Sequence, residues 1–240
     1  MRRVVVVPCF NEARRLDAGA LLQIVDDDTG LLLIDDGSSD DTLALLRSLA
    51  SGDPRRVEVL ALAHNSGKGE AVRHGLQHAE RAGAVVVAYL DADLSTPVSE
   101  MQRILALLDE RSDAQVALGS RVALLGADIE RKSSRHYLGR VFATVASKGL
   151  GLRVYDTQCG AKAFRASEPL RRALAQPFTS RWAFDVELLS RLLEDLPPRA
   201  FFEVPLQRWS DVAGSKLQPL AMVKAGVDVV RISLRRRRRR

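Results

Sequence analysis

One stretch, Tyr89-Leu90-Asp91-Ala92-Asp93-Leu94-Ser95-Thr96-Pro97, decides the fold of the chain. The apolar run 84–90 that enters it predicts a buried β-strand, and Pro97 ends the extended segment. A strand that ends in acids places them at the carboxyl edge of a sheet, where open α/β folds bind their ligands. Because the carboxylates of Asp91 and Asp93 would repel each other, they favour a divalent cation that also holds substrate phosphates. The alternative is a solvated turn after the strand.

The composition is that of a globular protein with a charged tail. The chain has 240 residues, of which 46% are hydrophobic and 28% charged, enough for one large α/β domain. The net charge of +6 comes from Arg235–Arg240, because the other 234 residues carry 30 basic and 30 acidic side chains. No basic stretch with interleaved aromatic residues precedes that tail, so we expect no specific nucleic-acid partner.

The sequence also bears on location. No apolar stretch reaches the length of about 20 residues that a membrane-spanning helix needs, and the start of the chain does not resemble a signal peptide. Cys9 and Cys159 lie far apart and outside any metal-ligand spacing, which favours reduced thiols. We therefore expect a cytoplasmic protein without a transmembrane helix.

The first half of the chain alternates strand, loop and helix. Strands are predicted at 3–7, where Pro8 ends the run, and at 31–34, 57–62, 84–90 and 114–118. Helices are predicted at 14–25, 42–50, 70–82 and 98–108. This alternation is typical of βαβ units and predicts a mainly parallel central sheet flanked by helices.

The second half is less regular. We predict loops at 124–132 and 209–216, strands at 163–165 and 200–205, and helices at 137–150, 183–193 and 217–234. No internal repeat or linker is recognisable, so the sequence predicts one domain over residues 1–234, followed by the poly-Arg tail 235–240.

Polar residues follow three of the predicted parallel strands. They are Asn11-Glu12, Asp35-Asp36, and Asp91 with Asp93. The right-handedness of βαβ units places these strand ends side by side. The segment Gly67-Lys68-Gly69 lacks the spacing of a phosphate-binding P-loop, and no Gly-x-Gly-x-x-Gly follows the first strand, which argues against a nicotinamide dehydrogenase.

Several motifs match one family in order and spacing. In the first half they are Val5-Val6-Val7-Pro8-Cys9-Phe10-Asn11-Glu12, Ile34-Asp35-Asp36-Gly37-Ser38-Ser39-Asp40, Asn65-Ser66-Gly67-Lys68-Gly69 and Leu90-Asp91-Ala92-Asp93. They resemble the family-2 inverting glycosyltransferases, and this resemblance implies a GT-A type, Rossmann-like nucleotide-sugar-binding fold.

The second half narrows the resemblance. Its motifs are Gly119-Ser120-Arg121, Asp156-Thr157-Gln158-Cys159-Gly160, Arg181-Trp182-Ala183-Phe184-Asp185 and Gly214-Ser215-Lys216. They look most like the dolichyl- or polyprenyl-phosphate sugar synthases, and within these like the glucose-transferring branch. The resemblance implies a nucleotide-sugar-binding half over 1–121, an acceptor half over 122–216 and a terminal amphipathic helix over 217–234.

The resemblance implies a donor site at the sheet edge. Asp35 and Asp36 would anchor the base or ribose, Lys68 would approach the donor phosphates or Asp93, and Asp91 would contact the sugar-ribose side. The implied nucleotide-sugar-binding residues are Pro8, Asn11, Glu12, Asp35, Asp36, Lys68, Asp91 and Ala92.

It also implies a metal ion. Asp93 would hold Mg²⁺ or Mn²⁺ on the donor diphosphate, with Asp91 and Ser95 as the other candidate ligands, and the ion would neutralise the departing nucleoside diphosphate. Ser95 stands where mannose-transferring relatives often carry Gln, a stronger ligand.

A lipid phosphate acceptor is already an anion, so it needs cations to position it rather than a strong base. Arg121, Arg135 and Lys216 are the candidates, since guanidinium groups grip phosphate oxygens in two places. If the acceptor were a neutral hydroxyl, Asp185 would be the base candidate, with helix capping as its alternative role. Asp91, Asp93, Arg121 and Asp185 thus form the predicted catalytic set. Phe184 is expected to pack under the pocket.

We therefore expect an inverting transfer of a hexose, glucose from UDP-glucose, to a polyprenyl or dolichyl phosphate. Alternatives are a hydroxyl acceptor, GDP-mannose as donor, or a nucleotide-sugar-binding protein without turnover. Arg235–Arg240 would attract an anionic membrane surface, which predicts peripheral attachment at the cytoplasmic face.

Overall fold

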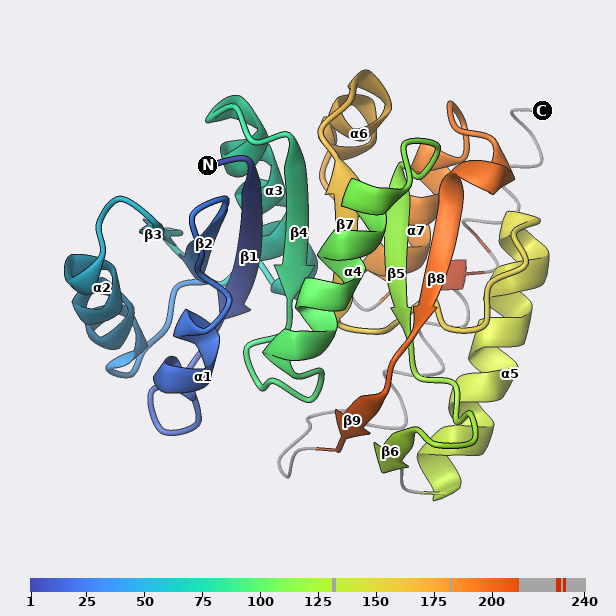
Figure 1. Ribbon diagram of the computed structural model, residues 1–240, viewed down its shortest axis with the longest axis horizontal. Coiled ribbons are helices and arrows are strands. Elements are labelled where there is room, and N and C mark those ends of the chain that lie inside the picture. Colours follow the sequence, from blue (N-terminus) through green and yellow to red (C-terminus); the bar gives the residue numbers. More distant parts are fainter. Residues whose placement is uncertain (131–132, 182, 212–227, 230, 232–240) are drawn as a thin grey trace.

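A computed structural model describes residues 1–130, 133–181, 183–211, 228–229 and 231 of the chain, without the side chains of 133–141. Its centre is a seven-stranded sheet in the order β3-β2-β1-β4-β7-β5-β8 (Figure 1). The strands of this sheet are β1 Arg3–Cys9, β2 Thr29–Asp35, β3 Val57–Ala61, β4 Val86–Leu90, β5 Val116–Ser120, β7 Ala161–Arg165 and β8 Phe201–Pro205. β7 runs antiparallel to both of its neighbours, while the other pairs are parallel. The predicted mainly parallel sheet is confirmed.

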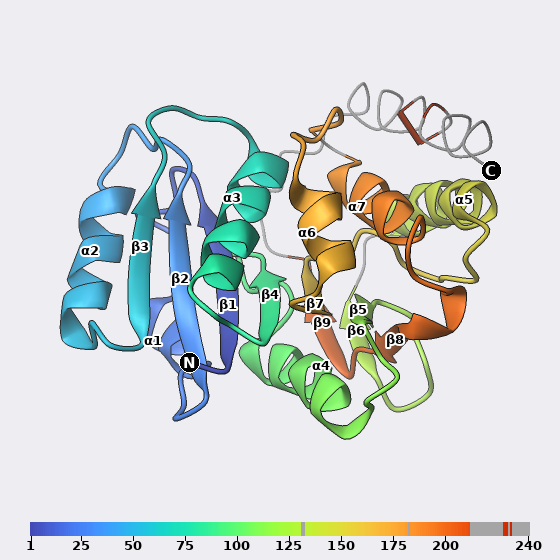
Figure 2. The same cartoon turned by 90° about the horizontal axis from the view of Figure 1, so that it is seen from above.

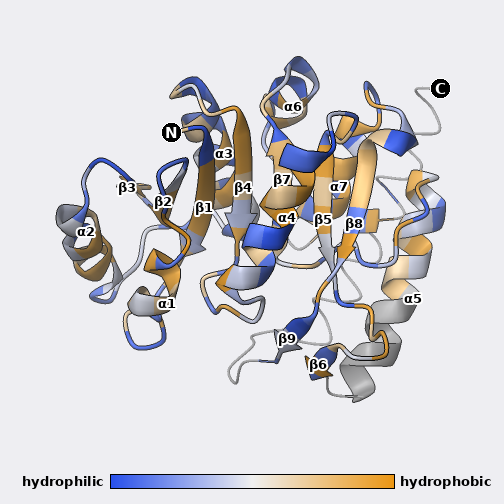
Figure 3. Cartoon of the chain, in the orientation of Figure 1, coloured by the Kyte–Doolittle hydropathy of each residue, from blue (hydrophilic) through white to orange (hydrophobic). Residues whose placement is uncertain are grey.

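Helices cover both faces of the sheet, as Figure 2 shows from above. They are α1 Ala18–Leu22, α2 Thr42–Gly52, α3 Lys68–Arg81, α4 Val98–Glu110, α5 Ser133–Leu150, α6 Glu168–Leu174 and α7 Phe184–Leu192, with a 3₁₀ turn at Pro198–Ala200. Alternate strand residues point to opposite faces and so build two apolar clusters. Val4 and Val6 pack with α3, α6 and α7, whereas Val5 and Val7 pack with α1, α2 and α4. Figure 3 shows the apolar strands between these layers.

The strand β1 continues past the predicted stop at Pro8 to Cys9. Its pairing with β4 ends at Val6↔Tyr89, while its pairing with β2 continues to Cys9↔Asp35. Pro8 therefore lies where only β2 runs alongside, and its missing N–H is tolerated there.

Four other segments differ from the prediction. The helix predicted at 14–25 is the short α1, because the Asp17 side chain accepts a hydrogen bond from Ala20 N and caps the helix there. The loop predicted at 124–132 contains β6 Asp128–Glu130, and the loop predicted at 209–216 overlaps β9 Arg208–Ser210, which pairs with β6 in parallel. The helix α6 was missed, although Ser167 caps it and Pro169 stands in its first turn.

The later part of the chain completes the same sheet. β7 lies between β4 and β5, and β8 forms the edge beside β5, so residues after 122 supply two of the seven strands. The helix predicted at 217–234 lies outside the described residues except for Asp228, Val229 and Arg231, which are helical.

Candidate active site

Three parallel strands end together at one edge of the sheet. β2, β1 and β4 are neighbours in that order and pair in parallel, so their carboxyl ends lie at the same edge. This arrangement brings Asp35-Asp36, Asn11-Glu12 and Asp91-Ala92-Asp93 to one place, as the handedness rule predicted.

Asp36 fixes the loop that precedes α3. Its carboxylate accepts hydrogen bonds from Ser66 N at 2.7 Å and Gly67 N at 2.9 Å. Gly37, with φ 66°, lets the backbone pass so close to His64 that a Cβ would lie 2.5 Å from the His64 carbonyl carbon. Burial raises the pKa of Asp36, and the two backbone donors oppose that shift. The side chain therefore joins the end of β2 to the loop at Lys68.

Asp35 carries an unused acceptor. Only 2% of the residue is exposed, and Oδ2 accepts a hydrogen bond from Ser38 N at 3.3 Å. Oδ1 is buried and accepts no hydrogen bond from the residues that the structure describes. Because a buried acceptor is costly to leave unpaired, this oxygen fits a ligand N–H or O–H.

The residues after β1 brace the neighbouring loop. Asn11, at φ 54°, accepts a hydrogen bond from Ser39 N at 2.9 Å through its side-chain oxygen. Glu12 donates its backbone N–H to Thr42 Oγ1 at 2.8 Å, and its carboxylate pairs with Arg15 at 2.6 Å. Pro8 is half-buried within β1. These residues shape the walls of the edge.

Lys68 and Asp91 form an ion pair at the end of β4. The ammonium lies 2.6 Å from Oδ1 and 2.7 Å from Oδ2 of Asp91, and 43% of the lysine side chain is exposed. Partial desolvation disfavours the ammonium, but the Asp91 carboxylate raises the pKa of Lys68 above its ordinary value. We predicted that Lys68 would approach the donor phosphates or Asp93. The carboxylate that it contacts is Asp91, because α3 begins at Lys68 and packs against β4.

Gly160 sets the position of Asp91. Its carbonyl accepts the Asp91 N–H at 2.9 Å. A Cβ on residue 160 would lie 2.1 Å from Asp91 Oδ2, so only glycine allows the carboxylate this close. The turn before β7 is thus part of the site.

Asp93 is the exposed member of the acidic pair. Its Oδ1 accepts a hydrogen bond from Ser95 N at 3.0 Å, in a turn where Leu94 has φ 50°. Ala92, between the two acids, is buried. Among the described residues, no three His, Cys, Asp or Glu side chains are grouped as a metal cage. A single exposed carboxylate fits a Mg²⁺ or Mn²⁺ ion whose other ligands are substrate oxygens and water.

Arg121 is held by Asp156 at the end of β5. Nε and Nη2 lie 2.6 and 2.9 Å from the two carboxylate oxygens, and the guanidinium lies 5.4 Å from the centre of the Trp209 ring. Asp156 is in turn fixed through its backbone N–H, which donates to Glu203 at 2.9 Å. The Nε–Nη2 side of the guanidinium that we expected on an acceptor phosphate is therefore already engaged by Asp156.

Asp185 belongs to a buried cluster that the sequence analysis missed. Its Oδ1 accepts hydrogen bonds from Tyr89 Oη and, at 2.8 Å, from Lys162 Nζ. Burial and the adjacent Asp185 carboxylate raise the pKa of Tyr89 well above its ordinary value. The residue that precedes α7 is Ala183, and no side chain caps the helix, so the capping role predicted as the alternative for Asp185 is wrong. The sequence feature that could have indicated this cluster is the single lysine within the apolar strand segment Ala161-Lys162-Ala163-Phe164.

The remaining predicted residues divide into two groups. Phe184 packs against Tyr89 and Phe178 beneath Lys68, as expected for a packing role. Arg135 lies in α5 without a described side chain, and Lys216 lies outside the described residues.

Arg181 is a further residue at this edge to which sequence reasoning gave no role. Its Nη2 donates to Asn65 Oδ1 at 2.9 Å, and its guanidinium packs against Gly67. It thereby links the segment before α7 to the loop that Asp36 holds.

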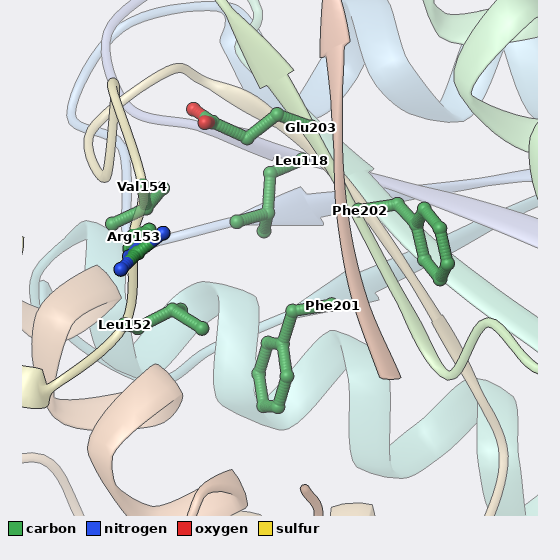
Figure 4. A pocket seen from close by; sticks show the side chains of 7 residues that line it. All are labelled: Leu118, Leu152, Arg153, Val154, Phe201, Phe202 and Glu203. Atoms are coloured by element: carbon green, nitrogen blue, oxygen red, sulfur yellow. The ribbon is translucent and has the colours of Figure 1, made fainter. Parts of the chain in front are cut away.

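A small cavity of about 60 Å³ lies elsewhere, between β5, β8 and the segment 152–154 (Figure 4). None of the residues predicted for the site lines it. The lining residues are Leu118, Leu152, Arg153, Val154, Phe201, Phe202 and Glu203. The chemistry-bearing residues instead follow β2, β1 and β4 at the carboxyl edge of the sheet.

Comparisons with known proteins match the chain to one family and to several relatives. Residues 4–168 match the model of the family described as Glycosyl transferase family 2. A dolichyl-phosphate beta-glucosyltransferase of Dictyostelium discoideum is 32% identical to the chain, over 96% of the chain and 73% of the relative. A polyprenol monophosphomannose synthase of Mycolicibacterium smegmatis is 29% identical, over 81% of the chain and 73% of the relative.

Solved structures share the fold. A mycobacterial protein aligns with a TM-score of 0.69 at 18% identity, over 98% of this chain and 74% of the other. A mannosyltransferase of Pyrobaculum calidifontis, in complex with GDP-Man and Mn²⁺, aligns with a TM-score of 0.55 at 17% identity, over 90% of this chain and 58% of the other. At these identities the likeness shows the fold alone.

Proposed function

The chain belongs to glycosyl transferase family 2, and from this premise we propose that it transfers glucose from UDP-glucose to a polyprenyl or dolichyl phosphate. The expected GT-A type fold and glycosyltransferase class are confirmed. The observation that carries the proposal is the acidic edge, where Asp91 paired with Lys68 and the exposed Asp93 follow a strand beside the buried Asp35.

The donor would lie along this edge. The unused Oδ1 of Asp35 suits an N–H or O–H of the nucleoside, and Lys68 carries the positive charge that phosphates require. Asp91 would contact the sugar-ribose side while Pro8, Asn11 and Glu12 shape the nucleoside pocket. UDP-glucose is the preferred donor because several relatives are named for glucose transfer. GDP-mannose is the second donor to test because another relative is named as a phosphomannose synthase.

We place the divalent metal at Asp93. Family-2 enzymes of this fold typically use such an ion, and the exposed carboxylate can offer an oxygen ligand. Asp91 is the weaker ligand candidate because Lys68 already neutralises it. Ser95 would contribute through its hydroxyl or a water. When bound, the ion stabilises the charge of the departing nucleoside diphosphate.

The acceptor would be an anion. An oxygen of the lipid phosphate attacks the anomeric carbon as the bond to the UDP oxygen breaks, and the UDP leaves with the electron pair. A single displacement of this kind inverts the anomeric centre. A phosphate needs no proton removed, whereas a hydroxyl acceptor would need Asp185, which is occupied by Tyr89 and Lys162. Arg121, Arg135 and Lys216 remain the proposed acceptor-positioning cations.

We further propose that the protein acts at the cytoplasmic membrane surface, where a lipid phosphate would be presented. Among the helices of the described residues, none is long and apolar enough to cross a bilayer. Arg235–Arg240 offer positive charge for an anionic leaflet.

A donor and metal screen tests the proposal. The full chain is incubated with undecaprenyl or dolichyl phosphate and UDP-glucose or GDP-mannose, with Mg²⁺, Mn²⁺ or chelator, and products are identified by mass. We expect glucosyl lipid phosphate only with metal, and a fall of about 100-fold or more in kcat/KM for Asp93→Ala. Asp113→Ala, an exposed acid after α4, is the control. Metal-independent transfer, or no product with any pair, would reject the mechanism.

A further inference from the structure

Lys162 is a buried cation whose three donors are all used. None of its side chain is exposed. Its ammonium lies 2.8 Å from Tyr89 Oη, 2.8 Å from Asp185 Oδ1 and 2.6 Å from the Cys159 carbonyl. An ammonium has three N–H donors, so this environment satisfies it fully.

Burying such a charged cluster in a core costs desolvation free energy that apolar side chains would not cost. Apolar side chains of similar volume are often as stable as a buried ion pair, or more stable, because both charges must leave water. The surroundings are apolar, since Tyr89 and Phe164 belong to the core cluster between the sheet and α7. Stability alone therefore gives no reason for a lysine at residue 162.

The three partners of Lys162 come from three segments that meet at the sheet edge. Tyr89 lies on β4, two residues before Asp91. Asp185 lies in the first turn of α7, and Cys159 lies in the turn that leads into β7. The ammonium thus joins β4, α7 and this turn at one point.

That turn seats Asp91. Cys159 is followed by Gly160, whose carbonyl accepts the Asp91 N–H at 2.9 Å and whose Cα faces the Asp91 carboxylate. A shift of the turn would move this contact directly. The hydrogen bond from Lys162 to the Cys159 carbonyl is the buried charged contact that holds the turn.

The other partner, Asp185, bears on Lys68. Phe184, next to Asp185, lies 6.0 Å below the Lys68 ammonium and packs so closely on Gly69 that a Cβ there would be 2.8 Å from the Phe184 Cβ. The start of α7 therefore supports the start of α3. Asp91 is therefore held by the Cys159–Gly160 turn and Lys68 by the start of α7, and Lys162 hydrogen-bonds to both segments.

We propose that Lys162 is a positioning residue which, through Asp185 and the Cys159–Gly160 turn, sets the geometry of the Lys68–Asp91 pair. The proposal rests on the proposed function only in taking Asp91 as a donor contact. Lys162 itself touches no substrate. It acts by fixing where the carboxylate and the ammonium stand before the donor binds.

The test removes both buried charges together. Lys162→Met/Asp185→Asn leaves no unpaired charge in the core but removes the donor to the Cys159 carbonyl. We expect a folded protein whose KM for the nucleotide sugar rises about tenfold while the KM for lipid phosphate is unchanged. The matched control is Arg3→Met/Asp109→Asn, which removes a charge pair spaced 2.8 Å between the start of β1 and the end of α4, away from this cluster. The control should lose thermal stability without changing the donor KM.

A second readout needs no donor. Acetylation of Lys68 by acetic anhydride, followed by mass spectrometry, reports how firmly Asp91 holds the ammonium, with the exposed Lys148 as internal reference. We expect Lys68 to react at least about threefold faster in the double variant, since a weaker pair leaves more free amine. This readout stays informative if the wild type transfers no sugar, in which case only the proposed function fails.

The outcomes are distinct. If the double variant does not fold, Gly160→Ala displaces Asp91 without changing a charge and should raise the donor KM in the same way. A folded double variant with the donor KM and Lys68 reactivity of the wild type would overturn the proposal. So would a wild-type donor KM in Gly160→Ala.

Discussion

At the scale of single residues, Asp35 is a candidate ligand-binding acid because one of its carboxylate oxygens has no hydrogen-bond donor in the part of the chain that the structure describes. Oδ2 accepts a hydrogen bond from the Ser38 N–H, and Oδ1 is buried without a donor among the described residues. We predict that Asp35→Asn weakens UDP binding about tenfold, the effect of losing one charge-assisted hydrogen bond. Calorimetric titration with UDP measures this. Asp41→Asn, at an exposed acid before α2, should bind UDP as the wild type does. Equal affinities for all three proteins would remove Asp35 from the site.

Arg121 yields a prediction about stability. Its guanidinium makes two hydrogen bonds to Asp156, and the two side chains are only 19% and 8% exposed. Arg121→Ala removes the opposite charge and both guanidinium hydrogen bonds from this buried carboxylate, which keeps backbone donors such as the N–H groups of residue 121 and Gln158, so the free energy of unfolding should fall by about 3 kcal/mol. Urea denaturation measures the loss, and Arg153→Ala, at an exposed arginine, should stay within about 0.5 kcal/mol of the wild type. If Arg121→Ala is as stable as that control, Asp156 does not depend on Arg121.

Residue positions were easier to predict than residue partners. The acids Asp35, Asp91 and Asp93 follow strands, and strand ends can be predicted from apolar runs. Lys68 was expected to approach the donor phosphates or Asp93, and the carboxylate that it pairs with is Asp91, because the choice depends on where α3 begins over β4. The pairing of Lys162 with Asp185 joins a strand to a helix through space, and no sequence period indicates it.

At the scale of elements, Gly75 allows α3 to lie directly on β1. A Cβ on residue 75 would stand 2.3 Å from Val6 Cγ1 and 3.1 Å from Ile34 Cδ1. We predict that Gly75→Ala lowers the free energy of unfolding by about 1–3 kcal/mol, because these branched core side chains cannot move aside. Thermal or urea unfolding measures it. Gly52→Ala, at the open end of α2, has no atom within 4 Å and should be neutral or slightly stabilising. Equal stability of the two variants would contradict the close packing.

Elements with a sustained apolar or amphipathic pattern were predicted, whereas the shortest elements, β6 and β9, were not. The βαβ units of the first half have apolar strands and amphipathic helices, so their alternation gave the parallel sheet and the neighbouring order of β2, β1 and β4. β6 and β9 have three residues each and exist through pairing with each other across about 80 residues of sequence. The insertion of β7 antiparallel between β4 and β5 also follows from tertiary pairing alone.

At the scale of the whole molecule, one continuous sheet carries both the proposed donor edge and the strands of the second half. β7 and β8, from the proposed acceptor half, flank β5, so Arg121 and Asp91 lie at the same edge although 30 positions separate them. An acceptor held near Arg121 would therefore lie at the same sheet edge as a donor held near Asp91.

The charge of the whole chain gives the last prediction. Without Arg235–Arg240 the basic and acidic residues balance at 30 each, so we expect the tail to supply the attraction to an anionic surface. Each arginine near such a surface contributes about 1 kcal/mol, and salt screens the attraction. Sedimentation with phosphatidylserine vesicles should show binding of the full chain at low salt, and little with phosphatidylcholine or at high salt. Replacing all six arginines with Gln keeps the length and removes the charge, and this variant should stay in the supernatant. Equal binding of the two chains to anionic vesicles would show that another surface holds the protein at the membrane.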